Sequence, residues 1–205
     1  MTTLCIIGDS GTLTRQAVHL ATVLAYDSIT VFGEADPALL PSGVEQKQLL
    51  EFHSSADGDA HVFYALMDTA EKSAAISKHT LGTMVNLIHP TAVISPTARL
   101  ARNIYVDANS VIGVNAEVAD GVVQNALSTI EHDNRIAQCA FLGTGAILCG
   151  HVSIGEFAFI GGGATVKPGT HIMANTVVGT GAVVVKDITV AGTYVGNPAQ
   201  VLQNK

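Results

Sequence analysis

The chain of 205 residues carries little charge, and little of that charge is positive. Only 13% of the residues are Asp, Glu, Lys or Arg, and 17 acidic residues outnumber 10 basic ones, for a net charge of −7. Proteins that bind nucleic acid rely on clustered Lys and Arg to neutralise phosphates. Because the sequence has no such cluster, we expect no nucleic-acid partner.

Cysteine is scarce too, and long apolar runs are missing. Cys5, Cys139 and Cys149 are an odd number with neither metal-ligand nor disulfide spacing, which is typical of a reducing compartment. No uncharged apolar run approaches the roughly 20 residues of a membrane span. The first residues also lack the basic and apolar segments of a signal peptide. We therefore expect a cytoplasmic protein that does not contact a membrane.

Tryptophan is absent and aromatic residues make up only 5% of the chain, although 48% of it is hydrophobic. The apolar residues are thus mainly Ala, Val, Ile and Leu, which suits stacked β-structure with small packing units. The length allows one large domain or two small ones.

The first part of the chain alternates between apolar runs typical of strands and segments with helical spacing. This alternation predicts a small Rossmann-like α/β domain with a parallel sheet over residues 1–88. The predicted strands are Leu4–Ile7, Ser28–Phe32, Val62–Leu66 and Met84–Ile88, and the predicted helices are Leu13–Ala25, Gln46–Phe52 and Thr69–His79, the last capped by Thr69.

Between the first strand and the first helix lies the turn Gly8-Asp9-Ser10-Gly11. A helix N-terminus presents unpaired N–H groups to anions, so this turn is a candidate phosphate or nucleotide site. The full G-x-G-x-x-G fingerprint is missing, and NAD is therefore not expected. Asp9 would also repel a phosphate that came close. A plain strand-to-helix turn that needs glycine for its backbone is the alternative, and both interpretations stay open.

From Ile94 onward, aliphatic residues recur with a period of six. Helices cannot keep such a period on one face, whereas the short strands of a parallel β-helix can. With three hexapeptides to a coil, residues eighteen apart stack on neighbouring coils about 4.8 Å apart. We expect this domain to span residues 89–188, followed by a tail at 189–205. The aliphatic positions are Ile94, Leu100, Val106, Ile112, Val118, Ile130, Ile136, Leu142, Leu148, Ile154, Ile160, Val166, Ile172, Val178 and Val184, with Gln124 as the exception.

Glycines form two columns with the eighteen-residue spacing. A groove without side chains would suit a long, thin ligand such as the pantetheine arm of coenzyme A. Alternatively, the corners of a β-helix favour glycine because the φ angle there is often positive. The columns are Gly143, Gly161 and Gly179, and Gly145, Gly163 and Gly181.

His132 is the candidate for proton-transfer chemistry. It lies two residues beyond Ile130, which should face inward, so His132 should project outward near a corner. Gly150 is its neighbour on the next coil. An imidazole can accept a proton from an attacking amine or hydroxyl, and a backbone N–H such as that of Gly150 can bond a developing oxyanion.

Two carboxylates flank this histidine. Either Asp133 or Glu131 could bond the second ring nitrogen and thereby fix the tautomer. Asp133 also stacks next to His151, so it could pair there instead. Asn125, and the loss of an aliphatic residue at Gln124, support a function for this coil.

Four motifs extend the pattern over nearly the whole chain. Together they resemble the PglD/NeuD-like family of bacterial hexapeptide-repeat sugar O/N-acetyltransferases. This resemblance implies a left-handed parallel β-helix, acetyl-CoA as co-substrate, no metal, and a homotrimer with its active site between subunits. The implied acceptor is the amino group of a nucleotide-linked amino sugar of the UDP-4-amino type, with O-acetylation of sialic acid as the alternative. The motifs are Asn125-x4-Ile130-Glu131-His132-Asp133, Gly150-x-Val152-x-Ile154-Gly155, Asn86-Leu87-Ile88-His89-Pro90 and Val195-Gly196-Asn197-Pro198-Ala199.

The resemblance implies that His132 is the base with Asp133 as its support and that Gly8, Ser10 and Gly11 hold the substrate, and the positions themselves add the other candidates. The catalytic set is His132 as the base, Asp133 or Glu131 as its support, and Asn125 as a helper. The substrate is held by the turn at Gly8, Asp9, Ser10 and Gly11. The cofactor set is Gly150, Phe141, Gly143, Gly161, Gly162, Gly163, Gly179, Gly181, Lys167 and Lys186.

Three positions depart from the family pattern. Phe141 stands where members often have a second histidine, Met67-Asp68 replaces a Gly-Asn turn, and the first turn reads Gly8-Asp9-Ser10-Gly11 instead of a Gly-Ser-Gly-His-like sequence. These changes leave acetyl transfer intact and the identity of the acceptor open.

Other functions receive less support. A γ-type carbonic anhydrase would need three histidines on zinc, and His132, His151 and His171 give no H-x4-H pair. A non-catalytic scaffold would not need the polar cluster at residues 130–133. An acyl-cysteine route through Cys149 is unnecessary for direct transfer.

Overall fold

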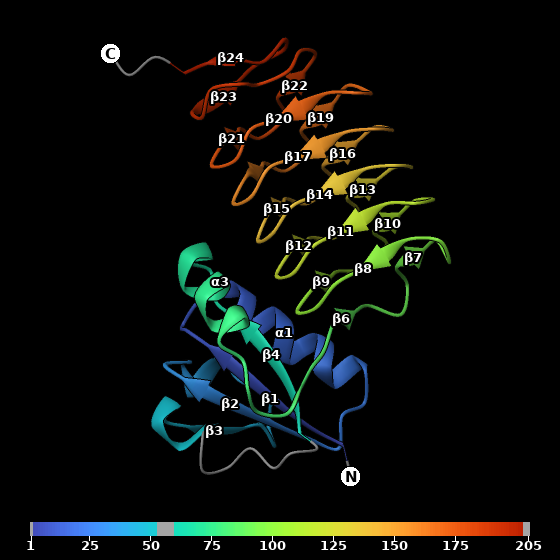
Figure 1. The fold of residues 1–205 in the computed structure, drawn as a ribbon. Coiled ribbons are helices and arrows are strands. Elements are labelled where there is room, and N and C mark those ends of the chain that lie inside the picture. Colours follow the sequence, from blue (N-terminus) through green and yellow to red (C-terminus); the bar gives the residue numbers. More distant parts are fainter. Residues whose placement is uncertain (1, 53–59, 203–205) are drawn as a thin grey trace. The chain divides into compact units, whose positions relative to one another are not determined.

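The computed structural model describes residues 2–52 and 60–202, which form two compact units, Met1–His89 and Pro90–Lys205 (Figure 1). No helix among the described residues is both long and apolar enough to cross a membrane.

The N-terminal unit is built on a five-stranded sheet in the order β3-β2-β1-β4-β5, in which every pair is parallel. Parallel strands need crossover connections, and helices supply two of them. The sheet is buried, as Leu4, Ile6 and Val62 are 0% exposed. The elements are β1 (Thr3–Gly8), α1 (Thr12–Val23), β2 (Ser28–Gly33), η1 (Pro37–Leu39), β3 (Glu45–Lys47), η2 (Leu49–Glu51), β4 (His61–Ala65), α3 (Thr69–Ser77), β5 (Thr83–Met84) and β6 (Leu87–Ile88).

Three local expectations for this unit were wrong. The helix expected at 46–52 is replaced by β3, which pairs with β2, and by the 3₁₀ turn η2; the Gln46 side chain supports the strand by donating to the carbonyls of Gly33 and Ala35. The strand expected at 84–88 is divided into β5 and β6. Helix α3 is capped by Asp68 and not by Thr69, because the Asp68 carboxylate accepts the Glu71 N–H at 2.8 Å.

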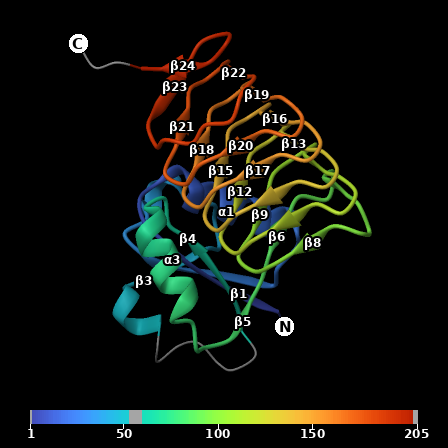
Figure 2. The same ribbon diagram turned by 45° about the horizontal axis from the view of Figure 1, so that its top comes forward.

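The C-terminal unit is a parallel β-helix, which confirms the expectation from the period of six (Figures 1 and 2). Its repeated strands are two residues long and pair in register with partners eighteen residues away, as in Val111↔Thr129 and Ile112↔Ile130. The strands are β7 (Val93–Ile94), β8 (Arg99–Leu100), β9 (Tyr105–Val106), β10 (Val111–Ile112), β11 (Glu117–Val118), β12 (Val123–Gln124), β13 (Thr129–Ile130), β14 (Arg135–Ile136), β15 (Phe141–Leu142), β16 (Ile147–Leu148), β17 (Ser153–Ile154), β18 (Phe159–Ile160), β19 (Thr165–Val166), β20 (His171–Ile172), β21 (Val177–Val178), β22 (Val183–Val184), β23 (Thr193–Val195) and β24 (Gln200–Val201).

The second residue of each strand from β9 to β22 points into the coil and is buried, because side chains alternate along a strand. Gln124 takes this inward position and is 0% exposed. Its Nε2 donates to the carbonyls of Val111 and Ser128, both at 3.1 Å. Gln124 is therefore a donor inside the coil, while its Oε1 is buried without a partner in the described part of the chain, and its departure from the aliphatic pattern does not mark a surface site.

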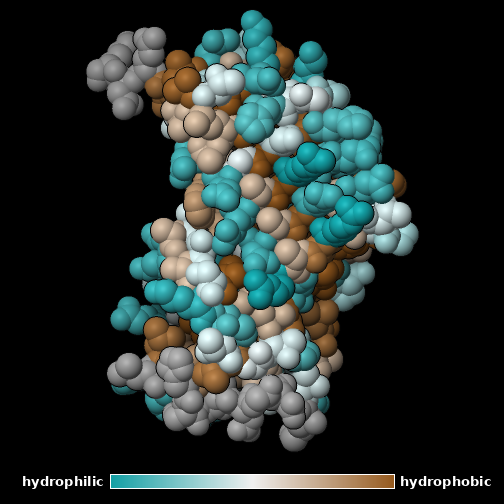
Figure 3. All heavy atoms as spheres, in the orientation of Figure 1, coloured by the Kyte–Doolittle hydropathy of each residue, from teal (hydrophilic) through white to brown (hydrophobic). Residues whose placement is uncertain are grey.

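The first residue of each strand points outward, which gives the β-helix three different faces. We call them the apolar face (β7, β10, β13, β16, β19, β22), the charged face (β8, β11, β14, β17, β20) and the aromatic face (β9, β12, β15, β18, β21). In the space-filling view, hydrophilic side chains form rows over the β-helix (Figure 3). The outward residues are Val93, Val111, Thr129, Ile147, Thr165 and Val183 on the apolar face, Arg99, Glu117, Arg135, Ser153 and His171 on the charged face, and Tyr105, Val123, Phe141, Phe159 and Val177 on the aromatic face.

Candidate active site

His132 lies in the turn that follows β13 and leads into β14. The turn is fixed by its backbone and by one buried side chain. Asp133 adopts a left-handed conformation with φ +57°, and its N–H donates to the Val114 carbonyl at 2.8 Å. Asn134 is 0% exposed, accepts from the Val152 N–H and donates to the Leu148 carbonyl. Asn134 thus ties this turn to the next coil, a role that sequence reasoning missed.

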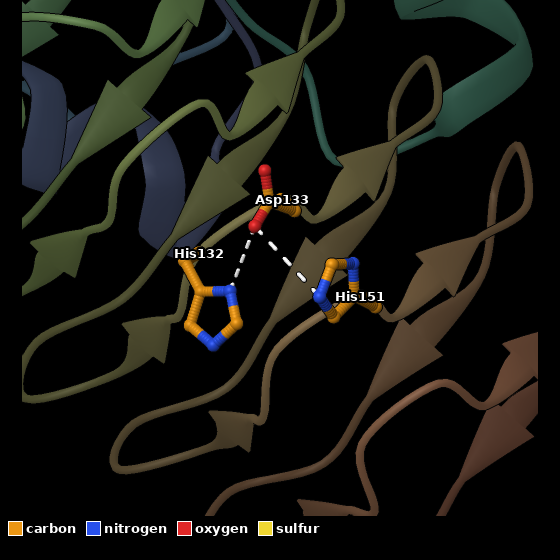
Figure 4. A group of neighbouring side chains, drawn as sticks. All are labelled: His132, Asp133 and His151. Carbon is orange, nitrogen blue, oxygen red and sulfur yellow. Dashed lines mark hydrogen bonds and ion pairs between the residues drawn. The ribbon is translucent and has the colours of Figure 1, made fainter.

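His132 and Asp133 form a hydrogen-bonded pair (Figure 4). The His132 Nδ1 atom lies 2.8 Å from Asp133 Oδ2. An ionised carboxylate can only accept, so Nδ1 carries the hydrogen and Nε2 carries the lone pair. The hydrogen bond from His132, followed by that from Asn115, lowers the pKa of the Asp133 carboxyl, which keeps it ionised. The pair thereby holds His132 in the tautomer that a general base needs.

Two more side chains surround the Asp133 carboxylate. His151 Nε2 lies 3.8 Å from Oδ2, and Asn115 Nδ2 donates to Oδ1 at 3.2 Å. The rings of His132 and His151 meet edge to face, with centroids 5.1 Å apart and an interplanar angle of 89°. Asp133 therefore contacts both histidines, and its contact with His132 is the shorter one.

Gly150 provides the space that the His132 ring occupies. A Cβ atom added at Gly150 would overlap His132 Cε1 and Nε2. The Gly150 carbonyl accepts from the Gly169 N–H at 2.9 Å, while its own N–H donates to no acceptor within residues 2–52 and 60–202. A lone pair and an unused N–H donor are thus side by side, which is an arrangement suited to acyl transfer.

Glu131 and Asn125 are placed differently from His132. Glu131 is exposed, and its side chain makes no hydrogen bond or ion pair in the described part of the chain. Asn125 lies in the turn before β13, and its carbonyl accepts from the hydroxyls of Ser110 and Ser128 at 3.0 and 2.6 Å. Asn125 lies before β13 and His132 lies after it, so the two residues occupy opposite ends of this strand.

Some of the residues predicted to bind the cofactor lie at the His132 end of β13 or the equivalent turns, and the others lie toward the Asn125 end. We define the histidine edge as the turns 113–115, 131–133, 149–151, 167–169 and 185–187, and the glycine edge as the turns 125–127, 143–145, 161–163 and 179–181. The apolar face lies between the two edges. Lys167 and Lys186 are exposed on the histidine edge with Gly150. Gly162 and both glycine columns lie on the glycine edge.

The two glycine columns have different physical causes. At Gly143 and Gly161 an added Cβ would overlap the backbone of the next coil, and at Gly179 it would approach the Val195 side chain to 2.8 Å. Coil packing therefore requires this column. The column of Gly145, Gly163 and Gly181 has φ between +66° and +69° and only open space outside it. This second column leaves part of the edge free of side chains.

Phe141 lies on the aromatic face next to the glycine edge. Its ring stacks on that of Phe159, with centroids 4.7 Å apart and an interplanar angle of 5°. The pair gives a flat apolar surface at the position where the family pattern has a second histidine.

In the N-terminal unit, Gly8 and Asp9 line a pocket of 640 Å³ at the carboxyl ends of β1 and β2. Asp9 Oδ1 accepts the N–H of Gly11, the N-cap residue of α1, at 2.7 Å. The Asp9 carboxylate thus lies next to the start of α1, whose first turn has no side-chain cap. Sequence reasoning did not single out Glu34, which lines the pocket directly after β2, although an acidic residue directly after a predicted strand is a visible signal. The pocket is lined by Gly8, Asp9, Gly33, Glu34, Gln48, Leu49 and Glu71.

No protein-family model matches the chain, but solved structures do. PerB from Caulobacter crescentus, in complex with CoA and GDP-perosamine, is 30% identical, with a TM-score of 0.86 and coverage of 99% of this chain and 98% of PerB. The acetyltransferase domain of PglB from Neisseria gonorrhoeae, in complex with acetyl coenzyme A, is 28% identical, with a TM-score of 0.89 and coverage of 98% of both chains. A His-to-Ala variant of GDP-perosamine N-acetyltransferase from Caulobacter crescentus is 28% identical, with a TM-score of 0.85 and coverage of 100% and 98%.

Proposed function

Because the chain belongs to the sugar N-acetyltransferases of the hexapeptide β-helix family, we propose that it transfers the acetyl group of acetyl-CoA to the amino group of a nucleotide-linked amino sugar. The chain is an acetyl-CoA-dependent enzyme of the same kind as PerB, whose length it matches almost completely. The single observation that carries this proposal is the His132–Asp133 pair, whose free Nε2 lies over Gly150.

The chemistry follows from these atoms. The amine nitrogen attacks the carbonyl carbon of the thioester, and the proton that the amine loses passes to His132 Nε2. The Gly150 N–H donates to the oxygen on which negative charge develops. When the C–S bond breaks, the imidazolium returns its proton to the leaving thiolate, so CoA departs as the thiol. Asp133 holds the Nδ1 hydrogen throughout and balances the charge of the imidazolium.

We propose further that the N-terminal unit is a Rossmann-type domain that binds the nucleotide part of the substrate. The strand order β3-β2-β1-β4-β5 supports this, because doubly wound sheets of that order bind nucleotides beyond the carboxyl ends of their strands. The pocket at Gly8, Asp9 and Glu34 lies at those ends. UDP as the carrier stays a prediction; PerB was solved with a GDP-linked sugar.

We also propose a cytoplasmic homotrimer of left-handed β-helices, in which two subunits form each site. Within one chain the base is on the histidine edge, whereas Phe141, Asn125 and the open glycines are at or next to the glycine edge. The apolar face between them exposes Val93 by 63% and Ile147 by 42%. If three apolar faces turn toward one axis, the histidine edge of each subunit meets the glycine edge of the next.

The proposed activity is tested by thiol release from acetyl-CoA against UDP-4-amino sugars, GDP-4-amino sugars, dTDP-amino sugars and free sialic acid. We expect turnover with one nucleotide amino sugar and its loss in His132→Ala. Turnover with sialic acid alone would move the assignment to O-acetylation. No turnover and no acetyl-CoA binding would favour the scaffold.

A further inference from the structure

The contacts around Asp133 include more donors than acetyl transfer needs. His132 Nδ1 and His151 Nε2 both point toward the same carboxylate oxygen, at 2.8 and 3.8 Å (Figure 4). One potential ligand atom from each of these three residues lies within 4.8 Å of the other two. Only the His132 contact is required to orient the base, so the His151 imidazole is available as a further ligand.

We propose that His132, Asp133 and His151 form a reversible binding site for Zn²⁺ or a similar transition-metal ion, and that the bound ion switches the enzyme off. This inference goes beyond catalysis, which needs no metal, and its inhibitory part depends on the proposed function of His132 as the base.

The donor set suits zinc in number, type and spacing. Zn²⁺ binds imidazole and carboxylate at about 2.0–2.2 Å in a tetrahedron, which places ligand atoms about 3.3 Å apart. The observed separations of 2.8 and 3.8 Å lie on either side of that value. Two imidazoles also favour Zn²⁺, Cu²⁺ or Ni²⁺ over Mg²⁺ and Ca²⁺, which prefer oxygen ligands. Three protein ligands leave the fourth position for water.

The site is also held in place and open to ions. Asp133 and His151 occupy equivalent left-handed corners of successive coils, with φ +57° and +61°. The His151 N–H donates to the His132 carbonyl at 3.0 Å, and Asn115 fixes the second carboxylate oxygen as an outer partner. The side chains of His132, Asp133 and His151 are 50%, 37% and 66% exposed, so an ion reaches them from solvent.

Binding would disable the base through its tautomer. A neutral imidazole has one hydrogen and one lone pair. When Nδ1 gives its lone pair to the ion, the hydrogen resides on Nε2, which then cannot accept a proton from the amine. The ion also takes the Asp133 oxygen that held Nδ1–H. Inhibition is therefore expected to be complete, and removal of the ion by a chelator restores the original pair.

Binding and inhibition are measured separately on the full-length protein. Titration calorimetry with Zn²⁺ and visible absorption with Co²⁺ report binding, and mass-spectrometric detection of the acetylated sugar reports activity without interference from CoA thiol. We expect one ion for each chain, a tetrahedral Co²⁺ spectrum, and loss of activity that EDTA reverses.

Variants identify the ligands. His151→Ala should weaken Zn²⁺ binding by at least about tenfold, since even outer partners of metal ligands contribute that much. His132→Ala should weaken it similarly in the calorimeter. His171→Ala removes an exposed histidine of the charged face and Cys149→Ser removes a nearby thiol, and both should bind Zn²⁺ as the unaltered protein does. Inhibition is compared within each variant, with and without Zn²⁺, so altered basal rates cancel.

Two results would overturn the inference. Zn²⁺ binding that is absent, or unaffected by His151→Ala and His132→Ala, eliminates the site whatever the enzyme acetylates. Binding at the site with undiminished turnover eliminates the switch. Failure of the proposed function itself is distinct, because it would appear as absence of turnover in the EDTA-treated protein.

Discussion

At the scale of single residues, Asp133 organises the site, because three side chains direct donors at its two oxygens. His132 and His151 approach Oδ2, and Asn115 donates to Oδ1. A carboxylate held from several sides cannot rotate away from the imidazole. The orientation of the base therefore depends on Asn115, a neighbour from the preceding coil, whose hydrogen bond holds the second carboxylate oxygen.

Replacement of the base should remove most of the activity. We expect His132→Ala to reduce kcat by roughly 10²–10⁴, the usual contribution of a general base, with an unchanged circular dichroism spectrum. Asp133→Asn should cost less, because the amide oxygen can still accept from Nδ1. Steady-state kinetics measure both. An equal rate in His132→Ala and the unaltered enzyme would refute the mechanism.

Gly150→Ala should be nearly as damaging, although it adds only a methyl group. Its Cβ would displace the His132 ring, so the loss should approach the roughly 10²–10⁴ in kcat that a general base contributes. Gly192→Ala is the matched control, since a Cβ there meets its nearest neighbours at 3.7 and 3.8 Å. Wild-type kinetics in Gly150→Ala would show that Gly150 has no part in the reaction.

The Asp133 interactions also predict how stability varies with pH. The pKa of Asp133 is lowered in the folded protein from its ordinary value of 3.8. Its stabilising contribution is therefore fully present above that value and is lost as pH falls through the folded pKa. We expect Asp133→Asn to lower Tm at neutral pH, and the difference from wild type to shrink below about pH 4. A difference that grows in acid would contradict the assigned charge.

At the scale of elements, the coil turns are fixed by buried polar groups that the repeat pattern does not reveal. Asn134→Ala should destabilise the β-helix by about 1–3 kcal/mol, because it leaves the Val152 N–H buried without its acceptor. Denaturant unfolding measures this loss. Glu131→Ala, an exposed change in the same turn, should leave the stability unaltered. Equal effects of the two changes would argue against the role given to Asn134.

The sequence predicts elements well where a single pattern determines whether a residue faces inward or outward. The inward residues of the β-helix, such as Ile112 and Leu148, follow from a period that only stacked short strands satisfy. Segment 46–52 departs from the predicted helix because a tertiary effect, the pairing of β3 with β2, determines its structure and is not visible in the local sequence. The loss of an aliphatic residue at Gln124 indicates function in the sequence, because sequence alone does not show that Val111 and Ser128 offer its amide their carbonyl oxygens.

The repeat also predicts part of the candidate site. Gly150 and Asp133 follow from positions 18 or fewer residues from His132, so the repeat brings them together. Asn125 is equally close in sequence, yet the intervening strand carries it to the other edge. Asn115 was not anticipated, because its contribution depends on the rotamer of a corner side chain.

At the scale of the whole molecule, the apolar face should decide assembly. Ile147→Asp places a charge at the centre of that face and should dissociate the proposed trimer, with activity lost although the His132–Asp133 pair is intact. Ser153→Asp, the matched change on the charged face, should remain trimeric and active. Size-exclusion chromatography with light scattering distinguishes the two. A trimer that survives Ile147→Asp would show that the subunits associate through another surface.

Residues eighteen apart lie at equivalent positions on neighbouring coils, so the position of each side chain depends on the number of residues that precede it. Removal of one whole coil leaves each remaining edge and face aligned, so the molecule becomes shorter without losing its pattern. Removal of a single residue between β13 and β16 shifts every later residue by one position relative to the preceding coil. His132 then no longer lies over a glycine. Insertions and deletions in this half of the chain should thus be tolerated in units of a coil, because only whole coils keep His132 over a glycine.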